Sequence, residues 1–525
     1  MIIRSPYPDV TIPEISLPEY VLRRAAELGG RPALIEGPSG RVVTYADLAA
    51  GIRKTAVGLA KLGFKKGDVF AIYSPNLPEY AFVFHAVATL GGISTTVNPL
   101  YTADELAKQL RDSRARFMIT VPPFLENAQA AAKNSDVEKI FVFGEAEGAT
   151  PFAELMAEDG EPPKVEINPK EDLVVLPYSS GTTGLPKGVM LTHHNLVDNL
   201  CQFDGIEDIS PYTEEDTLIA FLPFFHIYGL IVILNVGLAS GASLVTMPRF
   251  DLQQFLELMQ KYEVTFAHLV PPIVLALAKH PMVDNYKFPK LRGLLSGAAP
   301  LGVGLTNEVS KRLNVVVVQG YGLTETSPVT HISPDIAEKI KPGSIGHCVP
   351  NTEIRIVDTE TGEDLGPGKD GELLVRGPQV MKGYLNNPEA TAEAIQNDWF
   401  HTGDIGHIDE DGYFYIVDRL KEMIKYKGYQ VAPAELEALL LTHPAVGDAA
   451  VIAKADDEAG EIPKAFVVKK SEVNAEEIMA FIADKVAPQK RIRALEFVEE
   501  IPKSASGKIL RRVLVEKERA AAQSG

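Results

Sequence analysis

Cysteine is scarce in this sequence, since only Cys201 and Cys348 occur among 525 residues. Two cysteines can build neither a disulfide framework nor a multi-cysteine zinc site, so we expect a protein of a reducing compartment. An excess of positive charge is also missing, because 51 basic residues against 70 acidic ones give a formal net charge of −19. This balance argues against nonspecific binding to nucleic acids or anionic membranes as the main function.

Long uncharged runs are rare as well, and the one that could be mistaken for a membrane span covers residues 218–245. It is long enough to cross a bilayer, but Pro223, His226 and Asn235 interrupt it, and a buried acyl pocket needs an equally apolar wall. The N-terminus has no apolar core of signal-peptide length, and the C-terminal Gln-Ser-Gly is not a peroxisomal address. We therefore expect a cytoplasmic protein without a membrane span.

Short apolar strands alternate with helices over about the first 340 residues. Helical spacing predicts helices over 20–28, 45–62 and 79–90, and apolar runs predict strands over 68–73, 117–121, 139–143, 172–177, 217–221, 243–247, 265–270 and 315–318. This alternation is typical of an α/β protein whose parallel sheets are covered by helices on both faces.

The pattern changes after about residue 340. Short strands over 353–357, 371–376 and 412–417 are separated by Gly, Asp and Pro turns, which predicts a small β-barrel or a distorted sheet. From residue 421 the order helix, strand, strand, helix predicts a compact α+β unit. We therefore expect a large N-terminal domain over 1–420, with a β-rich subdomain over about 340–418, and a small mobile C-terminal domain over 421–525.

A loop rich in hydroxyl groups and glycines follows the strand predicted at 172–177. Within ten residues it holds four hydroxyls, three glycines and a lysine: Ser179, Ser180, Gly181, Thr182, Thr183, Gly184, Lys187 and Gly188. Glycines let backbone N–H groups turn toward an anion, and hydroxyls and an ammonium add further donors. The spacing differs from the G-x-x-x-x-G-K-[ST] loop, but the composition still predicts a phosphate-binding loop.

Together with five further motifs, this loop resembles the signature sequences of the adenylate-forming superfamily of acyl-CoA synthetases, luciferases and peptide-synthetase adenylation domains. The other motifs are Gln319-Gly-Tyr-Gly-Leu-Thr-Glu, Gly371-Glu-Leu-Leu-Val-Arg-Gly, His401-Thr-Gly-Asp, Asp418-Arg-Leu-Lys-Glu-Met-Ile-Lys-Tyr-Lys-Gly and Pro502-Lys-Ser-Ala-Ser-Gly-Lys. Within the superfamily, the sequences over 224–229, 379–385 and 425–435 are most similar to those of 4-coumarate (hydroxycinnamate)–CoA ligases. The resemblance implies an ATP-dependent carboxylic acid–CoA ligase that acts through acyl-AMP on 4-coumarate- or cinnamate-type acids and releases AMP and pyrophosphate.

The resemblance also implies a nucleotide site with Mg²⁺, ATP and CoA as its small-molecule partners. ATP or AMP binding is expected at Ser179, Ser180, Gly181, Thr182, Thr183, Gly184, Lys187, Gln319, Gly320, Tyr321, Thr324, Asp404, Arg419, Gln430 and Lys508. Lys508, Lys187, Thr324, Glu325 and His226 are expected to be catalytic, and Glu325 is the expected ligand of Mg²⁺. The chemistry fits, because a carboxylate and a phosphate are both anions and their reaction needs positioned positive charge.

For the acid and for CoA, the resemblance implies two further groups of residues. The acid is expected to contact His226, Tyr228, Gly297, Ala298, Gly320, Pro328, Val329, Lys421 and Lys425, and CoA is expected to contact Arg249, Lys427 and Gly428. One small domain would then supply Lys508 to adenylation and Lys427 with Gly428 to thioester formation. Such a division of labour implies that this domain rotates between the two steps.

Other functions are compatible with the same motifs. A medium- or long-chain fatty acyl-CoA ligase would share every nucleotide motif and differ in the acyl pocket. A luciferase-type adenylating oxygenase and a non-catalytic binder of the same fold also stay open, as does the choice between monomer and homodimer.

Overall fold

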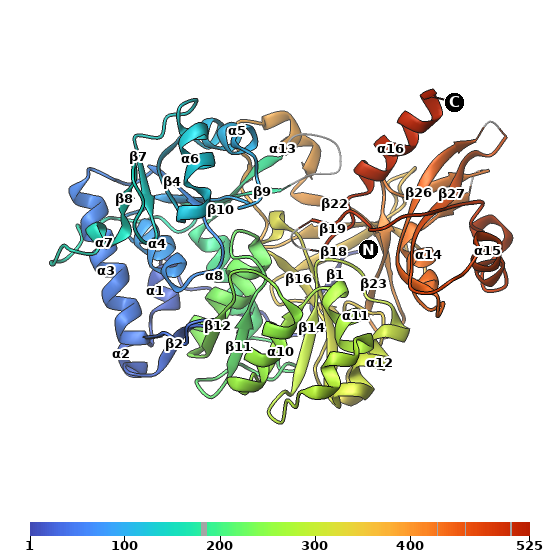
Figure 1. The fold of residues 1–525 in the computed structure, drawn as a ribbon, viewed down its shortest axis with the longest axis horizontal. Helices are drawn as coiled ribbons and strands as arrows, with labels where there is room; N and C mark the ends of the chain where they lie inside the picture. Colours follow the sequence, from blue (N-terminus) through green and yellow to red (C-terminus); the bar gives the residue numbers. More distant parts are fainter. Residues whose placement is uncertain (180–185, 428, 457, 505–506, 525) are drawn as a thin grey trace.

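A computed structural model describes residues 1–179, 186–427, 429–456, 458–504 and 507–524, and its strands in this part of the chain form four sheets (Figure 1). The first sheet has eight strands. Their order is β20 (Gly383–Tyr384), β10 (Lys187–Thr192), β9 (Leu173–Ser179), β5 (Ile93–Thr96), β4 (Val69–Tyr73), β6 (Ala115–Thr120), β7 (Lys139–Val142) and β8 (Thr150–Pro151). From β9 to β8 the pairings are parallel, whereas β10 and β20 are antiparallel additions.

A second sheet of nine strands forms the other half of the large body. Its order is β17 (His347–Cys348), β16 (Val329–Ile332), β15 (Val316–Gly322), β14 (Gly293–Ser296), β13 (Phe266–Leu269), β11 (Thr217–Ala220), β12 (Ser243–Thr246), β2 (Pro32–Glu36) and β3 (Val42–Thr44). The strands from β15 to β2 are parallel, and the outer ones are antiparallel. The carboxyl ends of β14 and β15 therefore lie together, which is where an open parallel sheet binds its ligand.

Helices connect the strands of these two sheets. They include α3 (Tyr45–Lys61), α4 (Pro78–Thr89), α5 (Ala103–Ser113), α6 (Leu125–Ala132), α7 (Phe152–Leu155), α8 (His193–Asp204), α10 (Leu252–Lys261), α11 (Pro271–Lys279), α12 (Val303–Leu313) and α13 (Pro388–Ala394). The α/β class expected from the alternating pattern is confirmed.

The β-rich part expected after residue 340 is an antiparallel sheet of six strands. It holds β1 (Ile3–Arg4), β18 (Glu353–Val357), β19 (Gly371–Arg376), β22 (Trp399–Ile408), β21 (Ile395–Gln396) and β23 (Phe414–Arg419). Register shifts interrupt the β19–β22 and β22–β23 pairings, so the sheet is distorted.

The C-terminal elements form a fourth sheet with its own helices at one end of the molecule (Figure 1). Its strands are β24 (Ile424–Tyr426), β25 (Tyr429–Val431), β26 (Val446–Asp456), β27 (Gly460–Lys469) and β28 (Ala494–Phe497), and its helices are α14 (Pro433–Leu440), α15 (Ala475–Ala483) and α16 (Arg511–Ser524). We call residues 421–525 the C-terminal unit and residues 1–420 the body.

Two segments differ from their simplest sequence expectation. The helix predicted over 20–28 is two short helices, α1 (Leu17–Val21) and α2 (Ala25–Leu28), because a capping box of Ser16 and Glu19 starts the first one early. The apolar run 218–245 forms β11, a π-helix η2 (Tyr228–Asn235), α9 (Val236–Ser240) and β12. Within the described ranges, no helix combines the length and the apolar character needed to span a bilayer.

Candidate active site

The predicted phosphate-binding loop connects two paired strands, β9 and β10. Ser179 and Lys187, at the ends of the loop, lie opposite each other in the pairing. The expected contacts of Ser180, Gly181, Thr182, Thr183 and Gly184 lie outside the described residues and stay predictions. The Lys187 ammonium lies 4.3 Å from the centre of the Tyr384 ring, which is within the range of a cation–π contact. The base of the loop therefore carries a positive charge held by an aromatic ring.

Glu325 lies beside this loop in the short 3₁₀-helix η4 (Thr324–Thr326), and its side chain is buried. Its Oε1 accepts hydrogen bonds of 2.9 Å from both the Ser179 and the Tyr384 hydroxyls. Among the described residues no three His, Cys, Asp or Glu side chains cluster as metal ligands. One carboxylate beside a phosphate-binding loop still fits Mg²⁺, which takes one or two carboxylates and completes its shell with phosphate oxygens and water.

A second buried carboxylate, Asp404 on β22, faces Arg419 on β23. The Arg419 Nε lies 3.2 Å from Asp404 Oδ1, and the Tyr321 hydroxyl donates a 2.6 Å hydrogen bond to Oδ2. Burial raises the pKa of Asp404, and the Arg419 charge opposes this shift. The group is thus an oriented hydrogen-bond acceptor near Glu325, whose negative charge also acts on Asp404.

Lys508 comes from the C-terminal unit, yet its side chain reaches the body. It lies after a tight turn in which the Lys508 backbone N–H donates to Ser504 Oγ at 3.1 Å and the Ser504 N–H donates to the Lys508 carbonyl at 2.8 Å. Burial and the Arg419 charge lower the pKa of Lys508, whereas Asp404 and Glu325 oppose this shift. The same charged cluster therefore contains groups from both parts of the chain.

Lys508 lies at the wall of a cavity that encloses about 580 Å³, part of it open to solvent. Seven of the nine residues predicted to contact the acid line it: His226, Tyr228, Gly297, Ala298, Gly320, Pro328 and Val329. Tyr321 and Thr324, predicted to bind the nucleotide, line it too. The structure thus brings most of the predicted acid site together with Tyr321, Thr324 and Lys508 of the predicted nucleotide site in one cavity.

Six apolar residues of the cavity wall were missed by sequence reasoning: Phe203, Ile227, Val232, Leu295, Leu323 and Ile332. Tyr228 and Val232 lie on the π-helix η2, a rare element that is frequent at functional sites. A Cβ at Gly229 would lie only 2.2 Å from the Pro223 carbonyl oxygen, so glycine is required where η2 begins. The apolar run 218–245 was the sequence signal for Ile227 and Val232, which lie inside it.

His226 lies at the cavity wall in the neutral state. Its Nδ1 accepts a 3.3 Å hydrogen bond from the Tyr228 backbone N–H. Burial and the nearby Lys508 charge lower the pKa of His226 to about 3. A neutral imidazole can orient a ligand but adds no charge to the cavity.

The remaining predicted residues lie elsewhere. Lys421, Lys425, Lys427, Gln430 and Arg249 are all exposed, and the expected site at Gly428 lies outside the described residues. Lys427 pairs with Glu458 at 2.6 Å within the C-terminal unit. Gln319 is buried, and its side-chain oxygen accepts a hydrogen bond from the Leu301 backbone N–H. Their roles in ligand binding stay predictions.

Comparisons with known proteins agree with this geometry. The family model described as "AMP-binding enzyme" matches residues 21–385, and the model of the AMP-binding enzyme C-terminal domain matches residues 435–508. A 4-coumarate–CoA ligase 1 from Solanum tuberosum is 48% identical over 524 residues, which cover 98% of this chain and 96% of the relative. A 4-coumarate:CoA ligase 1 from Petunia hybrida is 47% identical with the same coverage.

A solved structure of an anthranilate CoA ligase in complex with anthranoyl-AMP superposes with a TM-score of 0.90 at 28% identity, over 98% of this chain and 99% of that one. The family models cover both the body and the C-terminal unit, and the curated relatives extend the match to nearly the whole chain. The chain belongs to the family of AMP-binding enzymes.

Proposed function

We propose that this chain is an ATP-dependent carboxylic acid–CoA ligase that activates 4-coumarate- or cinnamate-type acids as acyl-AMP and transfers the acyl group to CoA. The observation that carries the proposal is the position of Lys508, which lies in the wall of the cavity that His226, Gly320 and Thr324 also line. The curated relatives named 4-coumarate–CoA ligases, 47–48% identical over nearly the full length, support the choice of acid.

The chemistry of adenylation assigns a task to each charged group. Attack of a carboxylate on the α-phosphate brings two anions together and releases pyrophosphate, so the site must supply positive charge at the reacting atoms. Lys508 lies where its ammonium can contact both anions, and Lys187 lies at the base of the loop predicted to hold the other phosphates. Asp404 has the carboxylate oxygens to accept hydrogen bonds from the ribose hydroxyls.

Glu325, together with phosphate oxygens, would hold Mg²⁺. The bound cation would neutralise negative charge on the phosphates. Ser179 and Tyr384 fix the carboxylate by donating to Oε1. These hydrogen bonds hold the Glu325 carboxylate against Ser179, at the base of the predicted loop.

The lining of the cavity supports an aromatic acid. A Cβ at Gly297 would lie 3.1 Å from the Tyr228 ring, whereas a Cβ at Gly320 would find its nearest neighbour, Leu295, at 3.5 Å. Glycine at these two positions lets the Tyr228 ring and the Leu295 side chain pack close to the backbone of the wall. Together with Phe203, Val232 and Ile332 they give the cavity an apolar lining, which fits an aromatic acid.

Thioester formation requires a second arrangement of the chain. Lys425 and Lys427 are exposed and do not line the cavity, so contact with CoA at the cavity needs the C-terminal unit to rotate. We place the hinge at Lys421, since β23 of the body ends at Arg419 and β24 of the C-terminal unit begins at Ile424. The division into domains 1–420 and 421–525 follows from this proposal.

A panel of acids tests the function. Purified protein with ATP, Mg²⁺ and CoA is given 4-coumarate, cinnamate, dodecanoate or palmitate, and both pyrophosphate and thioester are measured. We expect the highest kcat/KM with 4-coumarate. Preferential turnover of dodecanoate would assign a fatty acyl-CoA ligase instead, and the absence of pyrophosphate release with every acid would leave a binder without activity.

A further inference from the structure

A buried histidine lies directly behind the acid cavity and contacts two tyrosines. His268 on β13 is fully buried, and its ring meets the rings of Tyr212 and Tyr228 edge-on, at 88° and 89°. Its Nε2 lies 2.9 Å from the Tyr212 hydroxyl, and its Nδ1 lies 3.4 Å from the Tyr228 hydroxyl. Tyr228 lines the acid cavity, whereas Tyr212 lines a smaller pocket that shares Phe203, Leu295 and Ile332 with it.

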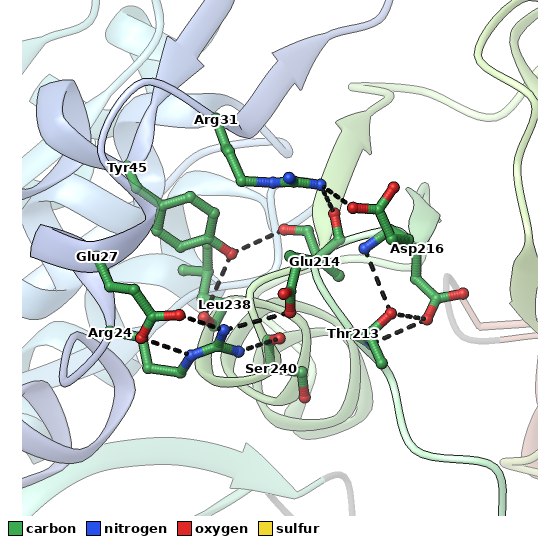
Figure 2. A network of polar contacts seen from close by, with 11 residues as sticks. Arg24, Glu27, Arg31, Tyr45, Thr213, Glu214, Asp216, Leu238 and Ser240 are labelled. Carbon is green, nitrogen blue, oxygen red and sulfur yellow. Dashed lines mark hydrogen bonds and ion pairs between the residues drawn. The ribbon is translucent and has the colours of Figure 1, made fainter.

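The outer tyrosine is held firmly. Tyr212 precedes a turn in which the Thr213 N–H donates a 2.9 Å hydrogen bond to Asp216, and Thr265 on the neighbouring segment donates to the same carboxylate at 2.6 Å. Figure 2 shows how this turn is fixed from the N-terminal side, where Arg24 pairs with Glu214 at 3.2 Å. Arg24 also bonds Glu27 and the Ser240 carbonyl, and Arg31 bonds the same turn at Glu215. Tyr212, which contacts His268, therefore precedes a turn that several hydrogen bonds and ion pairs hold in place.

The inner tyrosine, by contrast, has hydrogen-bonding capacity left for a ligand. The Tyr228 hydroxyl lies 3.4 Å from His268 Nδ1 and 3.4 Å from the Leu295 carbonyl oxygen, so both hydrogen bonds are long and a ligand can compete for the hydroxyl. Phe203, Val232 and Ile332, which line the same cavity, offer no polar side-chain group. A polar group on the acid would therefore find one strong partner at this end.

His268 limits the directions in which that hydroxyl can point. Burial and the Arg292 charge lower the pKa of His268 to about 3, so the ring is neutral, with one nitrogen donating and the other accepting. If Tyr212 donates to Nε2, then Nδ1–H points at the Tyr228 oxygen and the Tyr228 proton is directed away from the ring. If Tyr212 accepts from Nε2–H, then Tyr228 donates to Nδ1 and its oxygen is left to accept.

We propose that His268 and Tyr212 are positioning residues that orient the Tyr228 hydroxyl toward the ring oxygen of the acid, and that they thereby set the preference for para-oxygenated over unsubstituted cinnamates. The proposal rests on the proposed function and adds to it the residues that determine the preference between the two kinds of cinnamate. Because either tautomer is available, the same relay serves a phenol that donates and one that accepts.

The test compares 4-coumarate with cinnamate, which lacks the para oxygen. His268→Leu should lower kcat/KM for 4-coumarate about five- to tenfold, mainly through KM, and change that for cinnamate less than about twofold, as expected for one misdirected hydrogen bond. His268→Asn, whose amide can take the place of Nδ1, should recover part of the loss. Tyr212→Phe should lower kcat/KM about two- to threefold for 4-coumarate and leave kcat/KM for cinnamate unchanged. As a matched control, His85→Leu removes an equally buried histidine on α4 that lines neither cavity, and it should leave the preference unchanged.

A double-mutant cycle decides whether the effect passes through Tyr228. In a Tyr228→Phe background, neither His268→Leu nor Tyr212→Phe should change the ratio of the two acids further. A ratio that still falls in that background, or an equal loss with both acids, overturns the inference while leaving the ligase activity in place. If His268→Leu does not fold, as judged by thermal unfolding, Tyr212→Phe and His268→Asn carry the same cycle. A wild-type protein that turns over neither aryl acid would instead refute the proposed function itself.

Discussion

The body and the C-terminal unit contribute to the site in opposite ways. The walls of the cavity belong to the continuous core of the body, in which large side chains such as Phe224 and Tyr80 are fully buried. The C-terminal unit packs around two smaller clusters of its own, one centred on Ile424 and Leu436 and the other on Phe466. Of its described residues, one charged side chain, Lys508, lines the cavity.

Between the described residues of the two parts, few polar contacts are found. The Ala434 N–H donates a 2.8 Å hydrogen bond to Asp418 at the end of the body. The turn before Lys508 also packs on the body, since a Cβ at Gly507 would lie 3.2 Å from Val270. The difference indicates that binding of the acid and delivery of charge are separable, so each can be changed while the other is left intact.

The largest effect is expected for Lys508→Ala. Loss of one preorganised ammonium should lower the rate of pyrophosphate release about 10²-fold or more, because nothing else from the C-terminal unit lines the cavity among the described residues. The KM for the acid should change little. Lys503→Ala is the matched control, since Lys503 lies in the same turn but pairs with Asp448 at 2.6 Å within the C-terminal unit.

The second-largest effect is expected for Glu325→Gln, which tests the carboxylate that the body would provide to Mg²⁺. The substitution keeps the hydrogen bonds from Ser179 and Tyr384 available but replaces a carboxylate by a neutral amide. We expect adenylation to fall about tenfold or more at limiting Mg²⁺ and to recover partly as Mg²⁺ is raised. The exposed Glu338→Gln should have no effect. An unchanged rate at limiting Mg²⁺ would remove Glu325 from the metal site.

Gly507→Ala tests whether the contact between the body and the C-terminal unit is needed to position Lys508. Gly507 has a φ of +80° and faces Val270 and Pro272, so an added methyl group both strains the turn and pushes it off the body. We expect adenylation to fall about tenfold, with the binding of acyl-AMP preserved. Gly368→Ala separates the two causes, because Gly368 has a similar φ of +74° but no neighbour within 4 Å. Equal losses in both variants would assign the effect to backbone strain alone.

The mildest effect is expected in the pH profile. Burial and Arg419 lower the pKa of Lys508, so its ammonium loses its proton at a lower pH than an ordinary lysine as the pH rises. Adenylation should therefore decline on the alkaline side below the ordinary lysine pKa of 10.5. Lys508→Arg, which stays charged, should lack this decline even if its rate is lower. His226, with a pKa of about 3, should add no step between pH 5 and 8.

Much of this site could be predicted from the sequence, and the missing parts have a common cause. Alternating apolar runs predicted the sheets, and the motif resemblance predicted His226, Gly320 and eight other residues of the cavity wall. The resemblance could not reveal the contact between Tyr212 and His268, because these residues are 56 positions apart and each looks like an ordinary core residue. Nor did it predict that Lys421 and Lys425 are exposed, since motifs name residues but do not fix the orientation of one folded unit on another.

The most direct test of the claim that Lys508 acts only in adenylation measures the second half-reaction, thioester formation, by itself in the Lys508→Ala protein. Synthetic 4-coumaroyl-AMP and CoA are supplied without ATP, and thioester formation is followed while circular dichroism checks the fold. Because attack of the thiol on acyl-AMP requires no attack on the α-phosphate, the variant should form thioester at a rate within a few-fold of the wild type, although its adenylation is reduced about 10²-fold. Equal loss of both half-reactions would contradict the account, since a single arrangement of body and C-terminal unit would then serve both steps.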